Sequence, residues 1–96
     1  FRQQTAIYKN YTTNSGAANF AYNSQTISNV SNVNNISVNN YICNTQNRIW
    51  YRVTGVNSSA SSVTIQQPYE YGTATTAPYI STDTIVGLYN TVLTPN

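Results

Sequence analysis

Two carboxylates, Glu70 and Asp83, are the groups best suited to acid–base chemistry in this chain of 96 residues, which contains no histidine. A paired-carboxylate reaction such as glycoside hydrolysis would have to use these two residues. Thirteen positions and a proline-containing loop separate them, and no pattern in the sequence brings them together. We therefore expect both to be solvated side chains, not a catalytic pair.

Other reaction chemistry also lacks its residues. Without histidine there is no Ser-His-Asp or Cys-His arrangement, and the commonest general base and metal ligand are missing. A single cysteine, Cys43, cannot form a thiolate metal site, and the four isolated glycines form no phosphate-binding loop. We expect no enzyme activity, no metal and no cofactor. Cys43 is expected to be a small buried apolar residue; the alternative is a thiol that joins two copies of the chain.

Arg48, Trp50 and Arg52 are the residues best suited to binding. They alternate with apolar residues, and alternate residues of a strand share a face, so an indole would lie between two guanidinium groups. Trp offers a flat apolar surface and Arg offers planar donors, which suits a sugar or a protein partner. We treat the three as a candidate ligand strip, although the sequence favours the alternative that Trp50 belongs to the core and that Ile49, Tyr51 and Val53 face out or are covered too.

Four Asn-x-Ser/Thr triplets are candidate glycosylation sites, beginning at Asn10, Asn29, Asn35 and Asn57. The chain has 15 Asn, and a quarter of its residues are Ser or Thr, so chance alone gives about four such triplets. Their number is therefore no argument for glycosylation, and Asn57, in a predicted loop, is the best placed.

The stretch 47–67 must position most of these groups. Ile49, Tyr51 and Val53 alternate with the strip, and Val63 and Ile65 repeat the pattern after a Gly/Ser/Asn loop. Period-two alternation on both sides of such a loop predicts an antiparallel hairpin.

Short apolar segments separated by turn signals continue through the rest of the chain. They predict an all-β fold: a single antiparallel β-sandwich or partly open barrel of about seven or eight short strands, which a strand from a neighbouring subunit could complete. Residues 1–12 are expected to form an N-terminal strand, a candidate donor strand, and residues 13–96 a β domain. An N-terminal helix is the alternative for the first segment, although Thr, Ile, Tyr and Asn are mediocre helix formers. The Asn/Ser-rich segment 23–40 predicts short strands or a solenoid-like edge. Residues 73–78 predict a loop, and Gly87 predicts a bulge or bend near the C-terminal end of the chain.

Low charge is the distinctive feature of the composition. Charged residues make up 6% of the chain, against about 25% in ordinary proteins. The four cations are too few to indicate nucleic-acid binding, and no apolar run reaches the roughly 20 residues that cross a bilayer. A surface of Asn, Ser, Thr, Gln and Tyr has little net charge to keep copies apart, and the nine tyrosines suit interfaces as well as core edges.

Together, the Thr/Asn/Ser-rich strands, the near absence of charge and the apolar segments 5–12 and 88–94 make the chain resemble extracellular β-rich filament subunits of fimbrial, pilus or thread type. The resemblance implies an extracellular or cell-surface structural subunit that polymerises with copies of itself. It implies that Ala6, Ile7, Tyr8 and Tyr11 form the assembly interface, by strand addition to an open sheet edge. The alternative is a binding module, such as an adhesin, a fibre head or a carbohydrate-binding domain for surface glycans.

Overall fold

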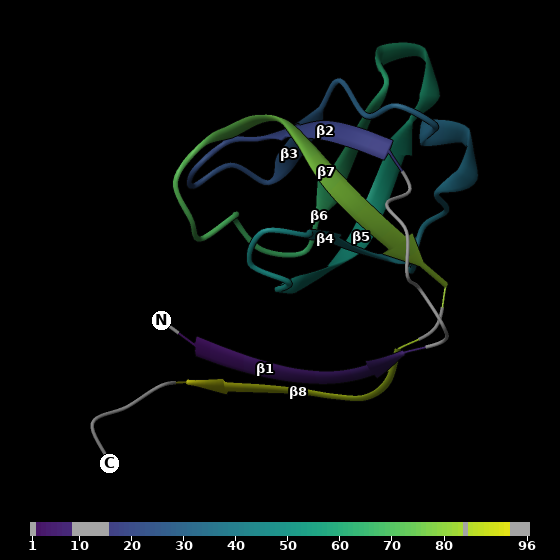
Figure 1. Ribbon diagram of the computed structural model, residues 1–96. Coiled ribbons are helices and arrows are strands. Elements are labelled where there is room, and N and C mark those ends of the chain that lie inside the picture. The colour runs from purple at the N-terminus through teal and green to yellow at the C-terminus, as the bar shows by residue number, and fades with distance from the viewer. Residues whose placement is uncertain (1, 9–15, 84, 93–96) are drawn as a thin grey trace.

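The computed structural model describes residues 2–8, 16–83 and 85–92, with side chains for residues 16–83. It is an all-β fold with no α-helix in those segments. Figure 1 shows a barrel with a separate two-stranded ribbon beside it. The barrel strands are β2 (Gly16–Phe20), β3 (Thr26–Ser28), β4 (Tyr41–Asn44), β5 (Trp50–Asn57), β6 (Ser62–Ile65) and β7 (Ala74–Thr82). The ribbon strands are β1 (Arg2–Tyr8) and β8 (Ile85–Val92).

The barrel is closed, in the order β2-β3-β6-β5-β4-β7, and every neighbouring pair is antiparallel. Strand β7 closes it because residues 74–79 pair with β2 and residues 79–82 pair with β4. Within the part that pairs with β2, strand β7 has one extra residue, because Ala18 pairs with Ala77 and Phe20 with Ala74; Thr76 has a left-handed backbone there (φ 52°). The all-β prediction is confirmed, but the structure has six closed barrel strands in place of a sandwich or partly open barrel of seven or eight strands.

The predicted hairpin is confirmed as β5 paired with β6. Its connection is shorter than expected because β5 continues through Gly55 to Asn57, with a register shift at Gly55, and a 3₁₀ turn (Ser58–Ala60) completes it. Residues 73–78 are mostly strand, not loop. Pro78 fits there because its carbonyl accepts from the Thr45 N–H just beyond β4, so its missing N–H faces the place where the β4 ladder ends.

Alternate strand residues fill the barrel interior with fully buried side chains, among them Phe20, Ile27, Ile42, Tyr51, Val53, Val63, Ile65 and Tyr79. Burial of each large apolar side chain contributes about 1.5–3 kcal/mol. Among the described residues, no buried side-chain nitrogen or oxygen lacks a hydrogen-bond partner.

The β3–β4 and β6–β7 connections close opposite ends of the barrel. They begin at opposite ends because β3 and β6, the strands that they follow, are antiparallel neighbours. The β3–β4 connection contributes Val30, Val33 and Ile36 to the core, around a 3₁₀ turn (Val33–Asn35). Only Thr26–Ser28 of the segment 23–40 is strand. Asn29, Asn32 and Asn39 adopt left-handed φ values of 50°, 60° and 76°, which asparagine tolerates and a continuous strand does not allow.

The ribbon is an antiparallel pair in which Arg2 lies opposite Val92 and Tyr8 opposite Ile85. Both links to the barrel therefore leave from one end of the ribbon, and the ends of the described chain lie at the other (Figure 1). Between Thr5 and Ile7 the register shifts, because β8 has one extra residue between Val86 and Tyr89. This irregularity falls at Gly87, the bulge or bend that the sequence predicts there.

Candidate functional site

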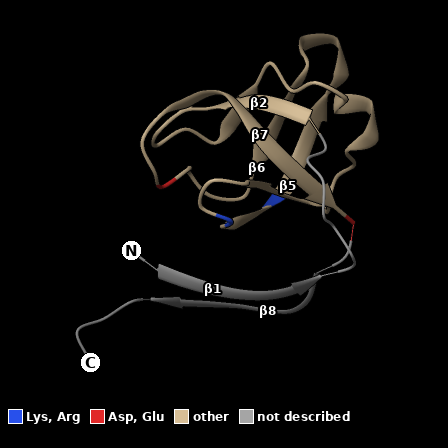
Figure 2. Cartoon of the chain, viewed as in Figure 1, with Lys and Arg blue, Asp and Glu red and all other residues tan. Residues whose placement is uncertain are grey.

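The structure separates the residues of the predicted ligand strip. Arg48 lies before β5 with a left-handed backbone (φ 58°) and is exposed, whereas Trp50 is only 3% exposed. Arg52 is half-buried, and its Nη2 donates to Asn39 Oδ1 at 2.5 Å. Figure 2 shows the Arg48 and Arg52 positions in blue near β5. The indole face needed for ligand stacking is not open in this arrangement.

Trp50 belongs instead to a buried row on the outer side of the barrel. It pairs with Cys43 on β4, and Cys43 pairs with Ile80 on β7. Tyr51, Ile42 and Tyr79, their neighbours along the strands, point into the core. Successive strand residues face opposite sides, so Trp50, Cys43 and Ile80 point away from it. All three are nonetheless at most 3% exposed. We call Trp50, Cys43 and Ile80 the outer row.

Burial also governs the chemistry of Cys43. Desolvation raises the pKa of its thiol to about 12, although the charge of Arg48 and a hydrogen bond to the Ile80 backbone oppose this. A thiol with this pKa is almost entirely protonated at neutral pH and is a poor nucleophile. The expectation of a small buried apolar residue agrees with this environment.

Glu70 lies in the connection before the nine-residue strand β7, and Asp83 directly follows that strand, which spans roughly 30 Å in extended geometry. Figure 2 shows the two acidic positions on opposite sides of the barrel in that view. Glycosidase carboxylates lie about 5–9.5 Å apart. The two residues therefore do not have the geometry of such a pair.

A cluster of aromatic rings closes the barrel end near Glu70. The Tyr69 ring lies 5.2 Å from Phe20, 5.8 Å from Tyr51 and 6.0 Å from Tyr71, measured between centroids. The Tyr69 hydroxyl accepts from Asn44 Nδ2 at 3.1 Å and from Asn47 Nδ2 at 2.9 Å. These contacts fix the segment that follows β6.

The Tyr51 hydroxyl anchors the next residue of this segment. It donates to Glu70 Oε1 at 3.3 Å and accepts from the Glu70 N–H at 3.2 Å. One phenol at the edge of the core therefore orients both the backbone and the carboxylate of Glu70.

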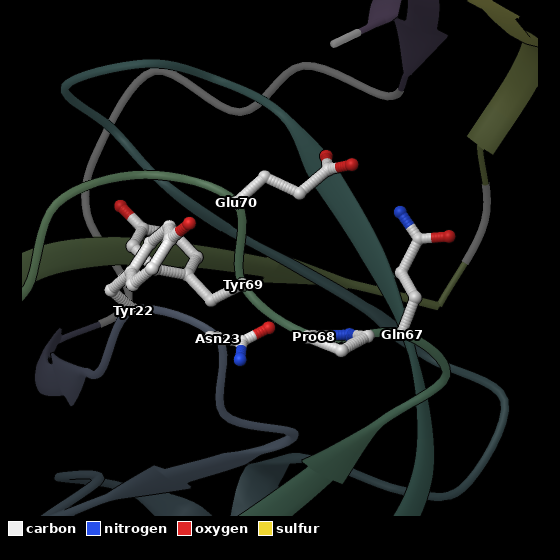
Figure 3. A pocket seen from close by; sticks show the side chains of 6 residues that line it. All are labelled: Tyr22, Asn23, Gln67, Pro68, Tyr69 and Glu70. Atoms are coloured by element: carbon white, nitrogen blue, oxygen red, sulfur yellow. The ribbon is translucent and has the colours of Figure 1, made fainter.

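An open pocket of about 390 Å³ lies over this barrel end. Figure 3 shows its lining, from the β2–β3 turn and the β6–β7 connection: Tyr22, Asn23, Gln67, Pro68, Tyr69 and Glu70. The two loops are joined by backbone hydrogen bonds from Asn23 N–H to Tyr69 C=O (2.8 Å) and from Tyr69 N–H to Ser24 C=O (3.0 Å). Sequence reasoning missed this pocket because it depends on tertiary pairing of two loops. Tyr22, which precedes the left-handed Asn23 (φ 62°), is 63% exposed.

The remaining predicted sites are distributed as follows. Asn29, Asn35 and Asn57 are exposed, and Asn57 Oδ1 accepts from the Ala60 N–H at 3.2 Å. Ala6, Ile7 and Tyr8 lie on β1, where only the backbone is described, and Asn10 and Tyr11 lie outside the described residues.

Within the described part of the chain, no group of three or more Cys, Asp or Glu residues is placed to hold a metal ion. No helix in that part is long and apolar enough to cross a bilayer.

These features define an all-β protein built as a small closed antiparallel barrel with an appended two-stranded ribbon. Comparison of the chain with protein-family models, with curated proteins and with solved structures finds no match in any of the three. Function therefore has to be argued from the geometry alone.

Proposed function

We propose that this chain is a structural subunit of an extracellular or cell-surface filament, and that copies join by strand addition to the β1–β8 ribbon. The observation that carries the proposal is the pairing pattern. Each barrel strand has a partner on both sides, whereas among the described residues β1 and β8 pair only with each other. The ribbon is thus the place where the described chain offers unpaired sheet edges.

The ribbon lacks the features that normally protect such edges. The strand sequences Arg-Gln-Gln-Thr-Ala-Ile-Tyr and Ile-Val-Gly-Leu-Tyr-Asn-Thr-Val contain one charge, at Arg2, and no proline. Natural sheets block edge pairing with charged residues, proline or very short strands, and these strands have seven and eight residues. A two-stranded sheet is also only marginally stable by itself in water, so additional strands would stabilise it.

The outer row supports a docked position for the ribbon. Trp50, Cys43 and Ile80 point away from the core and yet are buried within a single chain, so another segment of that chain must cover them. Figure 1 shows the ribbon on the side of the barrel where β4 and β5 run. We infer that one ribbon face packs on the outer row, which leaves the ribbon edges available to a neighbouring copy.

Two adjacent proline substitutions test the proposal. Successive N–H groups of an antiparallel strand point to opposite sides, so of Gln3→Pro and Gln4→Pro one removes a donor to β8 and the other a donor to the free edge. Sedimentation velocity of the full chain should show concentration-dependent assembly of the wild type. We call the proline variant that loses its donor to the free edge the free-edge proline variant. It should assemble less than the wild type, while its far-ultraviolet circular dichroism matches that of the wild type.

The two variants serve as controls for each other, because they carry the same substitution at neighbouring positions. A wild type that remains a single copy at all concentrations would contradict the proposal. Full assembly of both proline variants would contradict it equally.

A further inference from the structure

We propose that the pocket lined by Tyr22 and Glu70 is a binding site for a neutral saccharide. The inference does not depend on the ribbon, because the lining residues belong to the β2–β3 and β6–β7 connections. It places ligand binding away from the Arg48–Trp50–Arg52 segment, where the indole is buried.

The first observation is an exposed aromatic ring at a fixed position. Tyr22 is 63% exposed, one of two large apolar side chains left open among the described residues. Its backbone N–H donates to Thr73 Oγ1 at 3.1 Å, and the following residue is hydrogen-bonded to Tyr69. An aromatic ring on such a braced turn is a ready stacking surface for the C–H face of a pyranose.

The second observation is the polar lining around that ring. Asn23 and Gln67 bring side-chain amides, which both donate and accept, and Glu70 brings acceptor oxygens whose direction the Tyr51 hydroxyl sets. Sugar hydroxyls also donate and accept, so they match amides and a carboxylate. Figure 3 shows these groups around one opening, with the Pro68 ring between the amides.

The charge and shape of the pocket decide against other small ligands. No Lys or Arg lines it, so nothing there offsets the charge of an anion. A quaternary ammonium ion would need several open aromatic faces. Tyr69 is only 2% exposed, which leaves Tyr22 as the open ring of the pocket. A volume of about 390 Å³ suits one or two sugar rings.

The test is a ¹H–¹⁵N NMR titration of the full chain with cellotetraose, maltotetraose and chitotriose at millimolar concentrations. We expect at least one of them to shift resonances of the two pocket loops. Tyr22→Ala should weaken that binding about tenfold because the stacking surface is lost. Val38→Ala is the matched control: Val38 is the other exposed large apolar side chain (51%), lies outside the pocket, and should leave binding unchanged.

Glu70→Gln distinguishes binding of a neutral saccharide from binding of a quaternary ammonium ion. It keeps an acceptor oxygen, so saccharide binding should fall by less than the Tyr22→Ala effect, whereas binding of tetramethylammonium would require the charge. The proposal is overturned if no oligosaccharide shifts the pocket resonances, if Tyr22→Ala binds as well as the wild type, or if tetramethylammonium binds and Glu70→Gln abolishes it. Because Tyr22 is largely exposed, the amide spectrum of Tyr22→Ala should retain the dispersion of the folded chain.

Discussion

Removal of one oxygen atom, in Tyr69→Phe, tests the hydrogen bonds that help to close the barrel end beneath the pocket. Tyr69 is 2% exposed, and its hydroxyl accepts hydrogen bonds from the side-chain amides of Asn44 and Asn47. Asn44 is itself 1% exposed, so water cannot readily replace the lost acceptor. Leaving a buried donor unsatisfied costs about 1–3 kcal/mol, whereas phenylalanine keeps the ring contacts with Phe20, Tyr51 and Tyr71.

Urea unfolding followed by circular dichroism measures this cost, at a concentration where the chain is a single copy. We expect a lower midpoint with an unchanged slope, and a melting temperature lower by roughly 4–8 °C for each kcal/mol in a domain of this size. Tyr71→Phe is the matched control, because it removes a hydroxyl for which the structure shows no hydrogen bond to the described residues. Its stability should change by less than about 0.5 kcal/mol. Equal stabilities of the two variants would refute the role assigned to the Tyr69 hydroxyl.

Experiments at three further positions, Gly16, Cys43 and Asn57, have expected outcomes. Gly16→Ala should destabilise the chain by about 1–3 kcal/mol, because a Cβ there would lie 2.2 Å from Ser31 Oγ and 3.2 Å from Tyr79 Cε2. Gly72→Ala is the control and should be tolerated, since a Cβ at Gly72 meets no atom within 4 Å. Equal urea midpoints of the two variants would contradict this. Native Cys43 should react with a thiol reagent at pH 8 far more slowly than the unfolded chain. Rapid labelling of the native chain would argue against the buried outer row. The free energy of unfolding should fall as pH rises from 9.0 towards 12, because the thiol of the unfolded chain loses its proton before the buried thiol does. Cys43→Ala should reduce this pH dependence. Asn57→Ala should lower the free energy of unfolding by about 1 kcal/mol, because it removes the side-chain acceptor that caps the Ser58–Ala60 turn. Asn57→Asp keeps an acceptor oxygen and should lower it less. Identical stabilities of the two variants would show that the cap is unimportant.

The sequence predicted the strands that show clear period-two alternation, because that pattern depends only on residues adjacent in the chain. Period-two alternation at Ile49, Tyr51 and Val53 identified the β5–β6 hairpin, and Gly87 identified the irregularity in β8. Closure of the barrel was not predictable in the same way. It depends on β7 changing partners along its length, and Pro78, which suggested a loop, lies inside that strand because its carbonyl faces the end of β4.

The candidate sites were harder to predict because they depend on tertiary contacts. Alternation placed Trp50 opposite the core-facing residues, but it did not reveal that this outer face is covered. The pocket joins two loops that are distant in the sequence, and its stacking residue, Tyr22, is one of nine tyrosines with no local feature that distinguishes it. That ring precedes the left-handed Asn23, whose N–H pairs with the Tyr69 carbonyl in a contact that the sequence does not reveal.

Electron microscopy of the full chain as it is concentrated tests the central claim most directly. If the unpaired edges of the β1–β8 ribbon join copies, images will show filaments with a regular subunit repeat, and the free-edge proline variant will give few or none. Isolated particles of single-chain size at every concentration, for the wild type as for both proline variants, would contradict the account.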